Sequence, residues 1–244
     1  MSRGFGRSRR ISGILINKVK IKNKNKNKYK SIAMKNTKII QTGKYTYKIS
    51  IKASDKTNLL YSSILKTDIL TNSFYNSTDK SIYFTAETVS ALDPKHFLSE
   101  AKCIQMIDTL TRQIKYLETK QYAFYGHSIE DIIVINDDTF ININSETLLP
   151  IKDNTISFLS PFLKTQFMSP EISNITTLPS KIHYQSSYYS LAALVIYCFL
   201  NKTELEKDII TDVKKEDTLL KPIFYTKIYW FLKRCLHKRI LLLI

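Results

Sequence analysis

The apolar run at residues 188–200 is the feature that most limits what this chain can fold into. It has no charged side chain over about a dozen residues, whereas a helix that spans a bilayer needs about 20. A helix that is apolar on every side must be covered on every side by the rest of the protein. We therefore expect a buried central helix, and a chain of 244 residues with 43% hydrophobic residues can build a core around it.

Positive charge is concentrated at the N-terminal end. Residues 1–54 contain 16 Lys and Arg and no acidic residue, and the remaining chain is formally neutral, with 21 basic and 21 acidic residues. Residues 17–30 alternate lysine with asparagine or an apolar residue, a pattern typical of disorder. Residues 1–33 are either a tether for nucleic acid or another acidic surface, a solvated tail, or a stretch that precedes a true start at Met34.

The cysteines and the first residues indicate a compartment. Cys103, Cys198 and Cys235 form no CxxC pair, which argues against a zinc site or a disulfide framework and favours a reducing environment. The short apolar stretch at residues 11–16 is followed by lysines, which is not the pattern of a secretory signal. We expect a soluble intracellular protein, in the cytoplasm or the nucleus, with no transmembrane segment.

A small unit of mixed structure is expected after a basic tail of residues 1–38. Residues 44–51 and 81–85 alternate in the manner of strands and are rich in β-branched and aromatic residues. A short helix is expected between them, within residues 58–70. Residues 39–88 therefore form a β-rich unit.

The rest of the chain, residues 89–244, is predicted to be mostly helical. Apolar residues at spacings of four, three, four and three predict a helix over residues 98–117. They are Cys103, Ile107, Leu110, Ile114 and Leu117. Residues 132–135 and 139–144 predict a hairpin, and a polar, irregular stretch follows to about residue 165. Helices are then expected at residues 187–200 and about 224–236.

This order of elements and three motifs resemble the protein kinase fold. FMSPE at residues 167–171 is similar to the Ala-Pro-Glu signature, residues 187–200 to the central buried helix, and residues 229–239 to the last helices. The chain looks most similar to divergent kinase-like proteins of large DNA viruses. The resemblance implies an α+β, two-lobed fold, with a reduced β-rich N-lobe and a mainly helical C-lobe. It also implies a structural ion pair between Glu171 and Arg239.

The residues that carry kinase chemistry are mostly replaced. Phosphoryl transfer needs a carboxylate that orients the acceptor hydroxyl, and metal ions held by an aspartate and an asparagine. The resemblance places Gly126 at the catalytic aspartate and Asp131 at the metal-binding asparagine. The Asp-Phe-Gly signature falls on residues 144–146, from Asn144 to Glu146. The principal metal ligand is thus an amide, which binds Mg²⁺ more weakly than a carboxylate does.

The nucleotide-binding features are also reduced. No GxGxxG occurs, and Gly43 is the only glycine between residues 35 and 125. Lys52 is similar to the strand lysine that binds ATP phosphates, but no glutamate lies between residues 53 and 86 to pair with it. We interpret Lys52 as a solvated strand lysine; binding of the ATP phosphates is the alternative role that the resemblance implies for it.

Two further interpretations concern single residues. A register shifted by three would let His127, Glu130 and Asp131 imitate a catalytic loop; otherwise His127 is a surface loop histidine. The aromatic residues Tyr188, Tyr189 and Trp230 are expected to be core anchors.

The degenerate site favours a catalytically inactive kinase-like protein, a pseudokinase that binds or regulates a protein partner and needs no cofactor. The alternative is an atypical Ser/Thr protein kinase that binds ATP and Mg²⁺ with Asp131 and Glu146 as metal ligands. Binding of nucleic acid through residues 1–33 ranks last.

Overall fold

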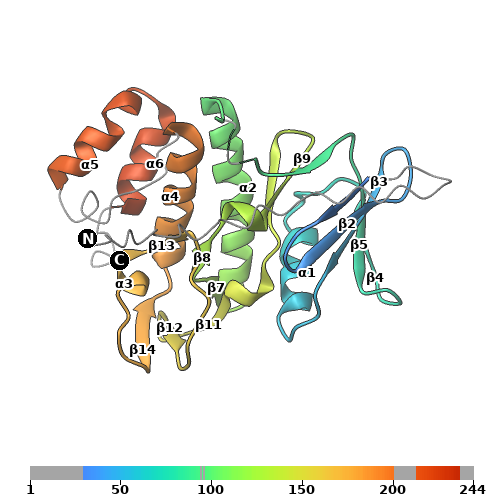
Figure 1. Cartoon of the computed structure of the whole chain (residues 1–244), viewed down its shortest axis with the longest axis horizontal. Coiled ribbons are helices and arrows are strands. Elements are labelled where there is room, and N and C mark those ends of the chain that lie inside the picture. The colour runs from blue at the N-terminus through green and yellow to red at the C-terminus, as the bar shows by residue number, and fades with distance from the viewer. Residues whose placement is uncertain (1–29, 94, 96, 201–212, 237–244) are drawn as a thin grey trace, which may run out of the picture.

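The computed structural model describes residues 30–93, 95, 97–200 and 213–236. In this part the chain is a mixed α+β protein (Figure 1). A five-stranded sheet and one helix lie at one end, the helices near the C-terminus lie at the other, and a long helix, α2 (Glu100–Thr119), lies between them. The basic segment of residues 1–29 lies outside the described residues, so its predicted disorder stays a prediction.

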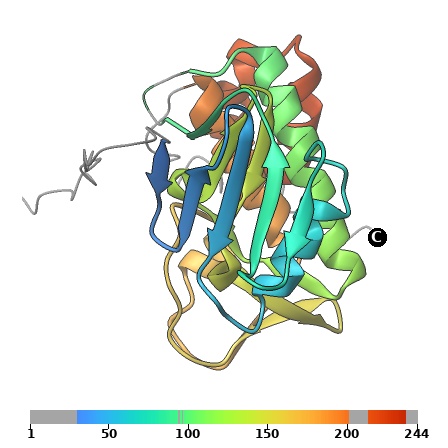
Figure 2. The same ribbon diagram turned by 90° about the vertical axis from the view of Figure 1, so that its right-hand side faces the viewer.

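The sheet at the N-terminal end is antiparallel and has the strand order β1-β2-β3-β5-β4 (Figure 2). Its strands are β1 (Ser31–Ala33), β2 (Thr37–Gln41), β3 (Thr46–Ile51), β4 (Phe74–Asn76) and β5 (Ser81–Thr85). Helix α1 (Thr57–Leu65) connects β3 to β4. Burial alternates along β3, so Ile49 and Ile51 face the core, where Leu60 and Ile64 of α1 also lie.

The sheet begins earlier in the sequence than the predicted boundary at residue 38. Ile32 of β1 lies opposite Ile39 of β2, and Ile39 is 1% exposed. The two isoleucines give this lysine-rich stretch a β-branched cross-strand pair and a contact with the core. The boundary at residue 38, which was based on charge, therefore lies several residues too far along the chain, because β1 already begins at residue 31.

Helix α4 (Ser186–Leu200) is the central helix that the apolar run predicts. It is buried along nearly its whole length and contacts α2, α6 and the strands β8 and β13. The other helices of this region are α3 (Pro170–Ser173), α5 (Val213–Leu220), α6 (Lys227–Leu236), and the 3-10 helices η1 (Ile129–Asp131), η2 (Ser145–Thr147) and η3 (Lys221–Ile223). Among the described residues, no helix is both long and apolar enough to cross a bilayer.

Small sheets connect these helices. One has the order β10-β9-β6, a second the order β14-β12-β11-β7, and β8 pairs with β13. Their strands are β6 (Val89–Ala91), β7 (Tyr122–Phe124), β8 (Gly126–His127), β9 (Ile132–Ile135), β10 (Thr139–Asn142), β11 (Leu148–Lys152), β12 (Thr155–Phe158), β13 (Phe167–Met168) and β14 (Ser180–His183). The hairpin β9–β10 confirms the prediction for this region.

The stretch expected to be irregular contains a second hairpin, β11–β12. Its two turn residues, Asp153 and Asn154, have φ values of 51° and 56°. Aspartate and asparagine tolerate this left-handed backbone, which suits the tight turn of a two-residue hairpin. The dipeptide Asp153-Asn154 indicates the turn, but the polar residues around it led us to expect an irregular stretch instead of two strands.

One expected core aromatic lies on the surface. Tyr189 is buried, as predicted, and Tyr188 is half-buried against the core, but Trp230 is 61% exposed. The buried residues of α6 are Ile228, Tyr229, Leu232 and Leu236. Their spacing places one face of α6 against the core, and Trp230 points away from that face.

Strand β1 should contribute measurably to stability. We expect a chain that starts at residue 34 to have a lower melting temperature than one that starts at residue 30. The free energy of unfolding should fall by about 1–3 kcal/mol, because the β1–β2 hydrogen bonds and the Ile32 contact are lost. Circular dichroism melting of the two chains measures the difference. Identical melting curves would show that β1 adds nothing to the sheet.

Candidate functional site

A connected set of buried polar side chains lies where α1, α2, β8 and the hairpin β9–β10 meet. Each of its members is at most 8% exposed. We call this set the polar seam, and it consists of Ser63, Gln113, His127, Asp131, Asn142 and Asn144. Buried polar groups are stable only with partners, so the contacts within the seam determine what it can do.

Gln113 of α2 is bonded to the main chain of β10. Its Oε1 accepts a hydrogen bond from the Asn142 N–H (3.0 Å), and its Nε2 donates to the Asn142 carbonyl oxygen (2.8 Å). Nε2 also donates to Ser63 Oγ of α1 (3.1 Å). One side chain thus joins both helices to the end of the strand.

The contacts of Asn142 determine the tautomer of His127. The Asn142 Oδ1 accepts from the Asn144 N–H (2.9 Å), so Nδ2 is the atom that lies 2.7 Å from His127 Nδ1. Because an amide nitrogen can only donate, His127 Nδ1 accepts and the ring proton is on Nε2. That Nε2 is buried and has no hydrogen-bond partner in the described structure.

The interpretation of His127 as a surface histidine is wrong. The residue is 0% exposed, and burial lowers the pKa of His127 to about 4, so the ring is neutral at pH 7. Its backbone N–H donates to Ser190 Oγ of α4 (2.7 Å), and that hydroxyl in turn donates to the Phe167 carbonyl oxygen. His127 lies inside the fold because β8 runs directly against the central helix.

Asp131 and Asn144 are in direct contact. Asn144 Nδ2 donates to Asp131 Oδ2 (2.9 Å), and Asn144 Oδ1 accepts from the Glu146 N–H (2.9 Å), which fixes the orientation of the amide. Burial raises the pKa of Asp131 to about 6, while the bond from Asn144 and the charge of Lys35 oppose the rise and the charges of Glu130 and Glu146 add to it.

Gly126 has no space for a side chain. A Cβ built on this residue would lie 2.0 Å from Thr165 Oγ1 and 3.1 Å from Met168 Cγ. Thr165 and Gly126 are both buried, so the threonine side chain occupies the volume that a larger residue at position 126 would need. An aspartate at position 126 is incompatible with this packing.

The other predicted site residues lie apart from the seam or at its edge. Lys52 is exposed after β3, its N–H donates to the Asn36 carbonyl oxygen (2.7 Å), and its side chain forms no ion pair within the part of the chain that the structure describes. Glu146 is exposed on η2, and Glu171 is half-buried on α3. Arg239 lies outside the described residues, so the ion pair between Glu171 and Arg239 stays a prediction.

The described residues contain no group of three or more His, Cys, Asp or Glu side chains that could hold a metal ion. The acids near Asp131 are Glu130 and Glu146, whose charges contribute to its raised pKa. Mg²⁺ is usually bound through one or two carboxylates together with substrate phosphates, so these acids would hold the ion only with a bound nucleotide.

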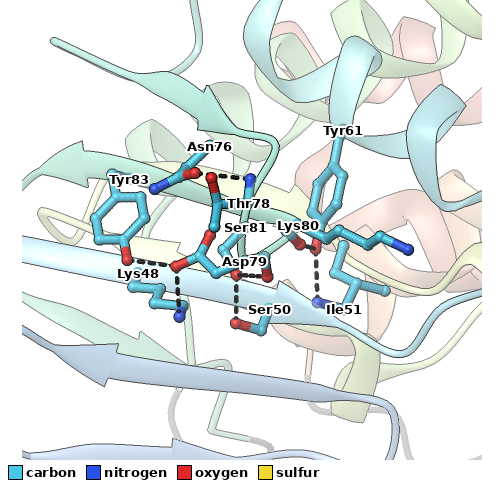
Figure 3. Close-up of polar contacts among 10 residues, drawn as sticks. All are labelled: Lys48, Ser50, Ile51, Tyr61, Asn76, Thr78, Asp79, Lys80, Ser81 and Tyr83. Carbon is cyan, nitrogen blue, oxygen red and sulfur yellow. Dashed lines mark hydrogen bonds and ion pairs between the residues drawn. The ribbon is translucent and has the colours of Figure 1, made fainter.

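A second polar cluster lies on the N-terminal sheet (Figure 3). Asp79 Oδ2 lies 2.7 Å from Lys48 Nζ and accepts a hydrogen bond from Tyr83 OH (2.6 Å). Tyr61 of α1 accepts from the Ile51 N–H (2.8 Å) and donates to the Lys80 carbonyl oxygen (2.9 Å). A tyrosine hydroxyl therefore attaches α1 to the end of β3.

Sequence reasoning missed Gln113, Asn142, Thr165 and Ser190. One of them had a signal: Gln113 lies on the apolar stripe of α2, directly before Ile114 and three residues after Leu110. A polar residue on a buried helix face usually has a specific partner. The partners of Thr165 and Ser190 lie far away in the sequence and carry no such signal.

The protonation of Asp131 should make stability depend on pH. The folded-state pKa of about 6 exceeds the ordinary value of about 3.9, so the contribution of Asp131 is present below about pH 4 and is lost as the pH rises through 6. We expect Asp131→Asn to gain about 2–3 kcal/mol relative to the unchanged chain between about pH 4 and pH 7.5. Urea unfolding across this range measures the gain.

The matched control for this experiment is Asp55→Asn, because Asp55 is an exposed carboxylate outside the seam. His127 is unchanged in both variants, so its opposite contribution, lost as the pH falls from 6.5 towards 4, cancels in the comparison. If the Asp131→Asn difference does not vary with pH, Asp131 is not desolvated as described.

The packing of Gly126 against Thr165 predicts a second result. Gly126→Ala should lower the free energy of unfolding by about 1–3 kcal/mol, and adding Thr165→Ala should recover part of the loss, because the clashing atom is then absent. Gly43→Ala is the control: its Cβ would meet Thr46 Oγ1 at 2.3 Å, but Thr46 is exposed and can rotate away. Equal losses at the two glycines would refute the packing argument.

The sequence was also compared with known proteins. Neither the models of known protein families nor the curated proteins gave a match to this chain.

Proposed function

We propose that this chain is a catalytically inactive, protein kinase-like protein that acts as a protein-binding or regulatory module. In this proposal the N-terminal sheet with α1 is the N-lobe, and the elements from α2 to α6 form the C-lobe. The order of elements supports it: a β-rich part, a long helix, a hairpin, a short helix that begins at FMSPE, and a buried central helix. The Ser169 side chain caps that short helix by accepting from the Ile172 N–H (3.4 Å).

The observation that carries the inactive assignment is the space around Gly126. Thr165 fills the position that an acceptor-orienting carboxylate would occupy, so the absence of an aspartate is built into the packing. A single reverse substitution would not restore a catalytic group there.

The metal side of the site supports the same proposal. Asn144 uses its amide N–H to bond Asp131 Oδ2, so this oxygen already has a partner. Lys52 is exposed and forms no ion pair among the described residues, although the segment after it contacts the loop of Asn144 through Ser54 Oγ and Ser145 Oγ (3.1 Å). A protein-binding module needs a stable surface, and it does not need metal ligands or a lysine that binds phosphates.

One observation favours the alternative, an atypical Ser/Thr protein kinase that transfers phosphate from ATP. Asp131 is a buried carboxylate, and Glu146 is close enough to contribute to the raised pKa of Asp131. Together the two acids would hold Mg²⁺ only in the presence of the nucleotide phosphates.

Nucleotide binding separates the two proposals. We expect millimolar Mg-ATP to leave the melting temperature of the full chain unchanged, whereas a ligand at a hundred times its dissociation constant would add about 2.7 kcal/mol to the unfolding free energy. The same melts with ATP and EDTA, and with Glu146→Ala, are the controls, because Glu146 is the exposed member of the proposed ligand pair. A rise that requires Mg²⁺ and disappears in Glu146→Ala would support the kinase and contradict the inactive assignment.

A further inference from the structure

Four aromatic rings lie in contact at the start of α6. The ring centroids of Phe224 and Tyr225 are 5.0 Å apart, those of Phe224 and Tyr229 4.9 Å, and those of Tyr229 and Trp230 5.0 Å. We call these residues the aromatic cluster. Tyr229 is buried and anchors the cluster, while Tyr225 is 97% exposed, Trp230 61% and Phe224 47%. Exposed apolar groups that are contiguous, rather than scattered, mark a binding surface.

Other exposed apolar residues lie beside this cluster. The Glu100 carboxylate, at the start of α2, accepts a hydrogen bond from the Lys227 N–H (3.3 Å), so the first turns of α2 and α6 are neighbours. Phe97 and Ile104, which flank Glu100, are 61% and 38% exposed. Five of the eleven exposed large hydrophobic residues in the described part of the chain are thus found at this one corner.

The corner is also positively charged. Residues 218–236 contain Lys221, Lys227, Lys233 and Arg234 and no acidic residue. Lys227, Trp230 and Arg234 follow at helical spacings of three and four, so they share one face of α6, and all three are exposed. The nearest acidic residues have partners: Asp217 pairs with Lys233 (2.9 Å), and Glu100 accepts the bond described above.

A hollow of about 410 Å³ opens beside the aromatic cluster. Its lining comes from α5, η3 and α6 and consists of Asp217, Thr218, Lys221, Phe224, Tyr229 and Lys233. Lys233 Nζ also contacts Tyr229 OH (3.2 Å), while Lys221 forms no ion pair among the described residues. Because Lys233 is already paired with Asp217, Lys221 is the ammonium group in this lining that can hold a phosphate next to the rings.

We propose that this corner binds the surface of a membrane that contains anionic phospholipids. A lipid phosphate would lie beside Lys221 at the hollow, and Trp230, Tyr225 and Phe224 would enter the interfacial layer, where tryptophan and tyrosine are favoured. Lys227 and Arg234 would face the neighbouring headgroups. The proposal rests on this surface and is independent of the kinase assignment.

A lipid surface fits these features better than a protein partner does. A protein interface of standard size covers about 800 Å² on each partner and is polar at its rim, with hydrogen bonds across it. Here the exposed rings project from one turn and one helix face, and basic groups outnumber the acids Asp217 and Glu100 around them. Shallow insertion of rings below a layer of phosphates requires only that arrangement.

Trp230 gives a direct test, because it is the only tryptophan of the chain. The full chain is titrated with vesicles of phosphatidylcholine alone and with vesicles that also contain phosphatidylserine. We expect the emission of Trp230 to move to shorter wavelength only with the anionic vesicles, and the chain to sediment with them. Glycerol 3-phosphate alone should leave the emission unchanged.

Substitutions locate the contact. Phe224→Ser with Tyr225→Ser retains the Trp230 signal and should weaken vesicle binding at least about tenfold, because two inserted rings are lost. Lys221→Gln and Arg234→Gln should each weaken it about fivefold. The matched controls are Phe74→Ser, an aromatic residue 58% exposed on β4, and Lys38→Gln, an exposed lysine on β2. Circular dichroism checks that each variant folds.

Several outcomes would overturn the proposal. Sedimentation without a change in Trp230 emission would assign the binding to another part of the chain, such as the basic segment of residues 1–29. A shift on raising the protein concentration without lipid would indicate self-association, and a larger shift with an oligonucleotide or glycerol 3-phosphate would indicate a soluble polyanion or phosphate ester. Equal losses in the corner and control variants would remove the assignment to α6.

Discussion

The interaction on which the rest of the site depends is the pair of hydrogen bonds between Gln113 and the main chain of Asn142. The end of β10 is buried, and without these bonds its N–H and carbonyl groups would have no partner, at a cost of about 1–3 kcal/mol for each unsatisfied group. With the backbone of Asn142 held, its side chain is positioned for both His127 and Asn144. The buried carboxylate of Asp131 is then positioned through Asn144, so a residue on α2 aligns a site in the hairpin.

Much of the frame follows from periodicity. The stripe along α2, the hairpin β9–β10 and the buried helix α4 were predictable because each depends on neighbours within a few residues of one another in the sequence. Asp131 and Asn144, two residues that the sequence analysis named separately, are in direct contact. Local patterns therefore predicted the elements, and the contact between these two residues came from the structure.

The environment of individual side chains was not predictable in the same way. His127 is buried because α4, more than sixty residues later, packs over β8, and Gly126 is crowded by Thr165, which lies on another loop. The exposure of Trp230 follows from which face of α6 meets the core. Apolar residues lie on several sides of that helix, so the sequence did not show which side would be buried. Contacts between distant segments decide such cases, and one sequence contains no periodic signal for them.

The proton on His127 Nε2 makes the interior observable. It is buried and has no hydrogen-bond acceptor among the described residues, so its exchange with solvent requires the surrounding segments to separate. Its nuclear magnetic resonance signal, in a region of the spectrum with few others, would therefore report the opening rate of the contact between β8 and α4. The unsatisfied donor would thus give a measurement of how often the core opens locally.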